Sequence, residues 1–132
     1  MKEVKLKIKM AYYDQDHCLI NSNESSTKGT LHLNGDNYML TYDLHHDQAD
    51  LYYVLHLSKK EMSMKIKGHD YQGLLYFIDK EGYLKSNGNH YQYCYDVEVE
   101  KYEYSLNKIK MQLHLFNKQI FMQTMLLSIK ID

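Results

Sequence analysis

Apolar and polar residues alternate along most of this chain of 132 residues, and the alternation is its clearest structural signal. Near the N-terminus, Val4, Leu6, Ile8 and Met10 alternate with lysines. A period of two residues is typical of a half-buried β-strand with one solvated face. Because the period of an amphipathic helix is hard to find anywhere in the chain, the sequence predicts an all-β protein.

From residue 27 onward the pattern predicts a series of hairpins, each of which can be tested by its cross-strand pairs. A turn at Gly35–Asp36 and another at Lys59–Lys60 would both bring apolar residues opposite one another. The pairs expected there are Leu33 with Tyr38, Leu31 with Leu40, Leu57 with Met62, Leu55 with Met64, and Tyr53 with Ile66. A further turn at Asp79–Gly82 and a type I′ turn at Asn87–Gly88 continue the meander, the latter placing Leu84 opposite Tyr91.

The long strand from His90 to Tyr104 changes phase partway along, since its apolar positions switch parity after Val99. A β-bulge near Glu100 and Lys101 would reconcile the two halves. The inner pairs that follow are Tyr104 with Ile109, Tyr102 with Met111, Val99 with Leu113, and Val97 with Leu115. The outer pairs are Glu103 with Lys110 and Glu98 with His114.

The last strand, Ile120–Ile131, is apolar on both parities and follows a predicted turn at Asn117–Lys118. The residues expected on its inner side are Phe121, Met125, Leu127, Ile129 and Ile131. A strand that is apolar on both sides is normally covered on both, so either another part of the chain or a second subunit should cover it. The polar segment from Asp14 to Ser26 is open to two interpretations, a strand of its own or a flap.

Together these elements predict one domain over residues 1–132, an antiparallel up-and-down barrel of about eight to ten strands in meander order. The stretches GTLHLNGDNYMLTYDL, LSKKEMSMKIKG and LLYFIDKEGYLKSN, followed by two long strands, resemble calycin-type barrels such as lipocalins and fatty-acid-binding proteins. Within that group the order of segments is similar to the YwiB-like family of small cytoplasmic barrels, whose function is uncharacterised. The resemblance implies a calycin-like fold and transfers no functional residue.

Charge and composition narrow the range of partners. The chain has 16 lysines, no arginine and 17 acidic residues, for a net charge of -1, and the two signs are mixed along its length. We therefore predict no basic face and no nucleic-acid partner, because the bidentate grip of arginine is also missing. The sequence shows neither a signal-peptide pattern nor an apolar run near the ~20 residues that span a bilayer. With its two cysteines, it favours a cytoplasmic protein without a membrane segment.

Histidines and cysteines supply the candidate chemistry for a metal or catalytic site. The clusters are His45, His46 and Asp47; His69 and Asp70; and His17 and Cys18. Neighbouring residues on a strand point to opposite faces, so these pairs do not converge as zinc requires, and we expect no metal. His32, His56 and His114 lie on the outer parity. No nucleophile, phosphate-loop or dinucleotide motif occurs in the chain, so neither an enzyme nor a cofactor is expected.

Tyrosine and methionine at inward positions are the feature most suggestive of binding. Buried phenol groups need hydrogen-bond partners, which a ligand, internal water or other tyrosines can provide, and methionine makes a wall adaptable. The candidate ligand contacts are Tyr42, Tyr91, Tyr93, Tyr95, Tyr102, Tyr104, Met64 and Met111, with Tyr38, Met62 and Met122 also inward. The leading hypothesis is a small apolar or amphipathic ligand in the barrel interior. The alternative is an interaction module with a filled core that dimerises through Ile120–Ile131.

Overall fold

The computed structural model describes residues 1–46 and 49–132, in which every regular element is a β-strand. The described residues contain no helix of the length and apolarity that crossing a bilayer requires. The strands are β1 (Lys2–Tyr13), β2 (Leu19–Asn34), β3 (Asn37–His46), β4 (Ala49–Leu57), β5 (Glu61–Lys67), β6 (Gln72–Ile78), β7 (Glu81–Asn87), β8 (Gln92–Tyr104), β9 (Lys108–Asn117) and β10 (Ile120–Ile131).

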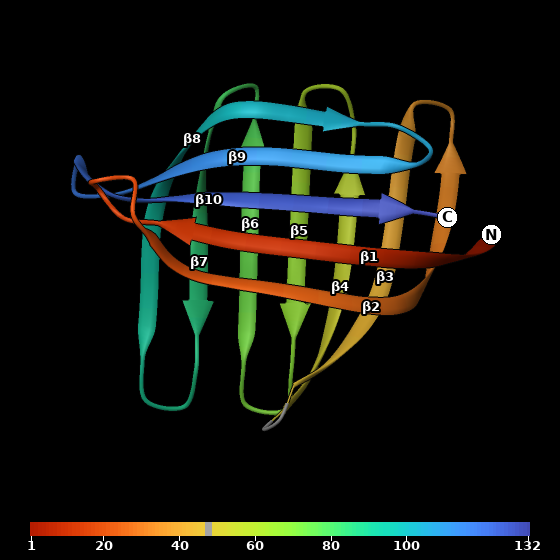
Figure 1. Ribbon diagram of the computed structural model, residues 1–132, viewed down its shortest axis with the longest axis horizontal. Coiled ribbons are helices and arrows are strands. Elements are labelled where there is room, and N and C mark those ends of the chain that lie inside the picture. Colours follow the sequence, from red (N-terminus) through yellow and green to blue (C-terminus); the bar gives the residue numbers. More distant parts are fainter. Residues whose placement is uncertain (47–48) are drawn as a thin grey trace.

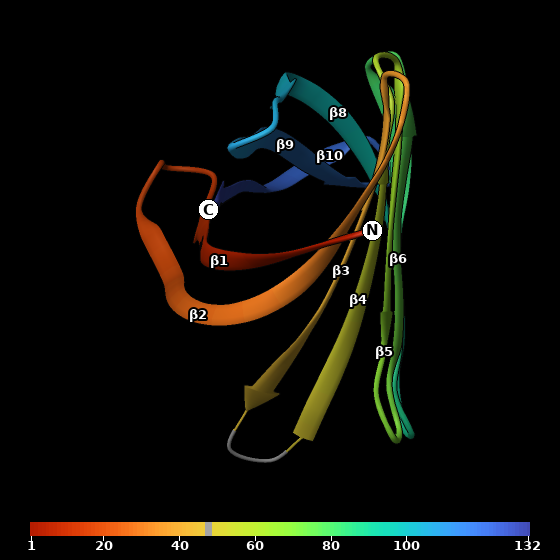
Figure 2. The ribbon, with the colours of Figure 1, turned by 90° about the vertical axis from the view of Figure 1, so that its right-hand side faces the viewer.

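The ten strands form one closed antiparallel barrel in meander order, and β1 closes it by pairing with both β2 and β10. The predicted fold class is confirmed. Figure 1 shows that β8, β9, β10, β1 and β2 cross in front of β3 to β7. Figure 2 shows these two halves as a curved layer and a flatter layer that enclose the core. The long strands β2 and β8 each bend, and so connect one layer to the other.

Three of the predicted hairpin registers are confirmed, and they lie in both layers. Every pair expected around residues 35–36, 59–60 and 106–107 is present. The register of β8 shifts between Val99 and Lys101, so the predicted bulge at Glu100 is also confirmed. This extra residue lets both halves of β8 keep their apolar side chains inside.

The register between β7 and β8 differs from the prediction. Leu84 lies opposite Tyr95 rather than Tyr91, because residues 88–91 form a wider connection. The N–H of Gly88 donates to the carbonyl of Tyr91 at 3.0 Å and closes this connection. The shift is an even number of residues, so the inward parity of β8 is preserved although its partners change.

Two inner assignments in β10 were wrong. The turn lies at Lys118–Gln119, where both residues have positive φ (51° and 71°), one position later than predicted. The register then shifts between Phe121 and Gln123. Phe121 consequently pairs with Phe116 on the outer side, and Met122 is exposed at the bulge. Met125, Leu127, Ile129 and Ile131 are buried as expected.

The undecided polar segment is mostly strand. Residues from Leu19 onward belong to β2 and pair with β1 along its whole length. The connection before it is a tight turn in which a carboxylate oxygen of Asp14 accepts the N–H groups of Asp16 and Cys18, both at 2.9 Å. This local network explains why so polar a segment is ordered.

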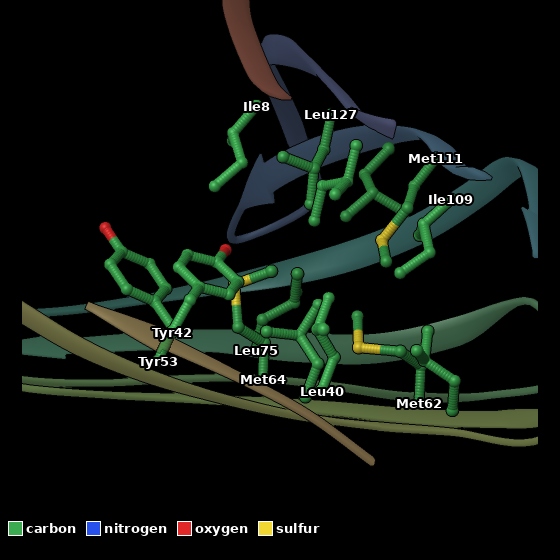
Figure 3. Packing of buried hydrophobic residues seen from close by; sticks show 14 of the residues in the cluster. Ile8, Leu40, Tyr42, Tyr53, Met62, Met64, Leu75, Ile109, Met111 and Leu127 are labelled. Atoms are coloured by element: carbon green, nitrogen blue, oxygen red, sulfur yellow. The ribbon is translucent and has the colours of Figure 1, made fainter. Parts of the chain in front are cut away.

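The core fills the space between the two layers (Figure 3). Apolar side chains from nine of the ten strands are buried there, and β7 contributes the half-buried Leu84. Those with 0% exposure are Leu40, Leu55, Met62, Phe77, Ile109, Leu113, Leu115 and Ile129. The middle of the barrel is therefore packed with large side chains rather than hollow.

Gly82 on β7 makes room for the largest of these side chains. It lies opposite Phe77, and a Cβ atom at Gly82 would come within 1.8 Å of the Tyr76 carbonyl oxygen and 2.7 Å of the Phe77 Cβ. The Phe77 ring is thereby free to pack edge-on against Tyr102 at 5.0 Å between centroids. The absence of a side chain at Gly82 thus allows Phe77 of the flat layer to pack against Tyr102 of the curved layer.

The change Gly82→Ala should destabilise the protein by about 1–3 kcal/mol, because the added methyl group has no room. Urea denaturation measures this change in the free energy of unfolding. Ser63→Ala on the outer side of β5 is the control and should change stability by less than about 0.5 kcal/mol. Equal denaturation midpoints for the two variants would contradict the packing argument.

Candidate functional site

Tyrosines plug one end of the barrel, the end at the top of Figure 1 where the β2–β3 and β4–β5 turns lie. The Tyr102 hydroxyl donates to the carbonyl of Ser58 at 2.7 Å, and the Tyr104 hydroxyl donates to the carbonyl of Asp36 at 2.8 Å. Tyr38 packs edge-on against Tyr104 at 4.9 Å between centroids. Burial, with a smaller contribution from Tyr104, raises the pKa of Tyr102. Because turn carbonyls satisfy both hydroxyls, these two tyrosines are structural.

The opposite end, near the connections 68–71 and 88–91, contains a cavity of about 360 Å³. It is the open end of the barrel. Among the described residues that line this cavity, none is acidic or basic. The lining combines phenol, amide and hydroxyl groups with thioethers and aliphatic side chains. Its members are Met10, Tyr12, Ile20, Asn21, Met64, Ile66, Tyr71, Leu75, Leu84, Ser86, Tyr93, Tyr95, Gln123 and Met125.

Tyr71 is held across the open end by two local contacts. The Ser86 hydroxyl donates to its phenol oxygen at 2.9 Å. A Cβ atom at Gly73 would lie 3.0 Å from the same oxygen, so the glycine lets the ring cross β6 closely. A loop residue thus becomes part of the cavity wall.

Burial makes the tyrosines beside the cavity poor acids. Tyr42 and Tyr53 stack with centroids 4.7 Å apart and planes inclined by 11°, side by side in Figure 3. Burial, helped by Tyr71 and Tyr12, raises the pKa of Tyr53 to about 12. Burial also raises the pKa of Tyr42 and of Tyr12. All three phenols are therefore neutral donors and acceptors at physiological pH.

The structure places the eight predicted contact residues in five different surroundings. Tyr93, Tyr95 and Met64 line the cavity, and Tyr42 is buried beside it in the stack with Tyr53. Tyr91 lies in the connection before β8 and is not part of the cavity lining, so its predicted inward position was wrong. Met111 is buried in the packed core. Tyr102 and Tyr104 belong to the plugged end.

Sequence reasoning missed several residues that line the cavity, including Tyr12, Tyr71, Asn21 and Gln123. Tyr12 continues the inward parity of Met10 and could have been found from it. Tyr71 lies in a connection, where parity gives no information. Gln123 becomes an inward residue only because of the bulge in β10.

The described members of the histidine clusters, His17, Cys18, His45, His69 and Asp70, are exposed on the surface. The His45 ring donates a hydrogen bond to the Asp50 carboxylate at 2.7 Å, which raises the pKa of His45, but both side chains are largely exposed. The side chain of His46 and all of Asp47 lie outside the described residues. In the described part of the chain, no three metal-ligating side chains converge. His114 lies opposite Glu98 as predicted, but its hydrogen bonds go to Glu100 and Thr124.

The outer side of β10 is partly covered by this chain's own side chains. Thr124 is 6% exposed and forms a hydrogen bond to His114, and Phe121 packs against His114 and Phe116. The strand is hydrogen-bonded to β1 on one side and β9 on the other. Part of the covering that the sequence required is thus supplied by this chain itself. Dimerisation through this strand stays a prediction.

Comparison with known proteins bears on the fold. The architecture is that of a closed antiparallel β-barrel. A crystal structure of the YwiB protein from Bacillus subtilis is similar, with a TM-score of 0.71 over 97% of this chain and 90% of that chain, at 14% identity. No model of a known protein family and no curated protein sequence matches the chain. The expected YwiB-like fold is confirmed, and the broader calycin-type relationship stays a prediction.

The change Tyr102→Phe should lower the free energy of unfolding by about 1 kcal/mol, because the Ser58 carbonyl loses its donor. Tyr93→Phe at the open end, where the phenol is half exposed, should cost less than about 0.5 kcal/mol. Urea denaturation of both variants tests the distinction between plug and cavity wall. A larger loss of stability for Tyr93→Phe than for Tyr102→Phe would contradict the assignment of Tyr102 to the plug and Tyr93 to the cavity wall.

The protein should lose stability as the pH rises from about 10 to about 12. The folded state holds the Tyr53 proton more tightly than the unfolded state, where the pKa is near 10.0. Its stabilisation is therefore complete below pH 10 and disappears as the pH approaches the folded value. Denaturation midpoints across this range, for the parent protein and for Tyr53→Phe, measure the effect. An equally steep loss in both proteins would contradict it.

Proposed function

We propose that this protein is a non-enzymatic, cytoplasmic barrel that binds a small uncharged molecule at its open end. The observation that carries the proposal is the cavity wall, in which the described residues include no acid or base. Charged residues make up 25% of the chain. A lining of fourteen residues without a formal charge suits a neutral ligand, because a charged one would lose its hydration there without gaining an ionic partner.

The cavity sets the size and chemistry of that ligand. Its volume of about 360 Å³ is at the lower end of the range for small-molecule pockets. Aromatic faces from Tyr93 and Tyr95 and thioethers from Met10, Met64 and Met125 suit a flat or flexible apolar body. Asn21, Ser86 and Gln123 add a few polar groups, which suit a hydroxyl or carbonyl on the ligand.

The packed core favours this end over the barrel interior as a whole. Met62, Phe77 and Leu113 are completely buried in the middle of the barrel, so a ligand would have to displace them to move deeper. The plugged end is closed by Tyr102 and Tyr104. We therefore restrict the earlier hypothesis of a ligand in the interior to the mouth near residues 68–71 and 88–91.

The dye N-phenylnaphthylamine, which is uncharged and fluoresces strongly in apolar surroundings, is a direct probe of the cavity. We expect saturable enhancement with the parent protein and affinity reduced about tenfold or more by Ser86→Met, which fills the cavity. Ser63→Met on the outer side of β5 is the matched control and should bind as the parent does.

Native mass spectrometry of freshly purified protein complements the dye by looking for a copurifying neutral molecule.

Two outcomes of the dye experiment would contradict the proposal. One is a dye signal that does not saturate, and the other is a signal that Ser86→Met and Ser63→Met change equally. Either result would leave the cavity as an unfilled gap at the end of a packed barrel.

A further inference from the structure

The barrel gathers lysines that are dispersed in the sequence. β2, β1, β10 and β9 are neighbours in the curved layer, and their outer side carries half of the chain's 16 lysines when Lys101 of β8 is included. All are exposed. The lysine face consists of Lys5, Lys7, Lys9, Lys28, Lys101, Lys108, Lys110 and Lys130. The prediction that no basic face forms holds along the chain but is wrong in space.

Cross-strand register places several of these lysines directly opposite one another. Lys130 pairs with Lys7 on one side and with Lys108 on the other. Lys5 likewise lies opposite Lys28. Like charges in directly opposed positions destabilise a sheet, and neighbouring strands are only about 4.8 Å apart. The row Lys7, Lys130 and Lys108 therefore concentrates positive charge at some cost to folding.

Acidic residues neutralise this face only in part. Glu3 shares the outer side of β1 with Lys5, and Asp132 is hydrogen-bonded to the Lys5 backbone at the same edge. Glu24 lies 3.5 Å from Lys7, and Glu103 lies opposite Lys110. Glu100, at the other edge, is hydrogen-bonded to Gln112 and His114. Lys130, in the middle of the row, has a lysine on either side.

A groove of about 440 Å³ runs beside the charged row. Three lysines, Lys9, Lys101 and Lys110, line it together with one carboxylate, that of Glu24. Its apolar groups include Ala11 and Leu126, and its hydrogen-bonding groups are Ser22, Asn23, Gln112 and Ser128. A hollow bordered by ammonium groups suits a chain-like anion, which can lie in it. A flat bilayer surface would leave it empty.

We propose that the lysine face binds a linear polyanion of phosphate groups. Lysine acts towards phosphate as a point charge, so such binding would depend on charge and spacing and not on base sequence. Two sources supply this chemistry, a single-stranded nucleic acid and inorganic polyphosphate. The site lies on the outer side of the sheet and shares only Met10 with the lining of the neutral cavity at the open end.

Fluorescence anisotropy with a labelled oligothymidine of about 20 nucleotides tests the proposal at low salt, near 50 mM. The triple variant K7Q/K108Q/K130Q should weaken binding by about tenfold or more. It should also reduce the magnitude of the slope of log K against log[salt] by about 2. K65Q/K67Q/K80Q removes the same charge from β5 and from the β6–β7 turn, and should bind as the parent does. Inorganic polyphosphate is titrated in parallel, as a competitor and by calorimetry.

The outcomes separate the sources and the alternatives. Loss of oligothymidine binding in the first variant only assigns the face to nucleic acid, and tight polyphosphate binding with weak oligothymidine binding assigns it to polyphosphate. Equal effects of the two variants, or no binding of either polyanion near 50 mM salt, would overturn the proposal. So would binding only to vesicles of phosphatidylserine and phosphatidylcholine. Thermal melting shows that each variant is folded, and K7Q/K108Q/K130Q should melt no lower than the parent.

Discussion

The pairing of β1 with β10 is the constraint on which the rest of the structure depends. It joins the first and last strands through a continuous antiparallel ladder from Leu6 opposite Ile131 to Tyr13 opposite Thr124. Without it, both strands would be long apolar edges with unpaired backbone groups. The ladder is also the most non-local contact in the fold, so its formation requires closing a loop of nearly the whole chain. The pairing of β1 with β10 therefore closes the barrel and removes both edges at once.

Closure also determines where a ligand can enter. A closed sheet of ten strands would enclose a lumen if it were round, but β2 and β8 bend and bring the two halves into contact as layers. Large side chains such as Phe77 and Leu113 then fill the middle. Space remains where the layers diverge near residues 68–71 and 88–91. The mouth is thus a consequence of strand bending, and its lining keeps the uncharged character of the barrel interior.

Register was predictable because the chain repeats one simple rule, and parity with cross-strand pairing tests that rule at many positions. The pair of Tyr102 with Met111, beyond the bulge at Glu100, follows from it. Connections were less predictable. The partner predicted for Leu84 was Tyr91, and the observed partner is Tyr95. These two tyrosines are four positions apart and have the same parity, so the alternation of apolar residues could not distinguish them. Parity also predicts which residues face the barrel interior, but it does not predict which end of the barrel they occupy. The sequence therefore did not distinguish Tyr102 at the plugged end from Tyr93 at the open end.

The lysine face illustrates a different limit of sequence reasoning. Lys7 and Lys130 are far apart in the chain, and their pairing is fixed by closure, the least local feature of the fold. Each local segment shows only ordinary alternation of charge with apolar residues. The same alternation gives β1 its two roles, since Met10 and Tyr12 face the cavity while Lys7 and Lys9 face outward. Because a strand separates its two sides completely, neutral and charged surfaces can be built from adjacent residues without mixing. A barrel wall one strand thick can thus present an uncharged inner side and a lysine-rich outer side.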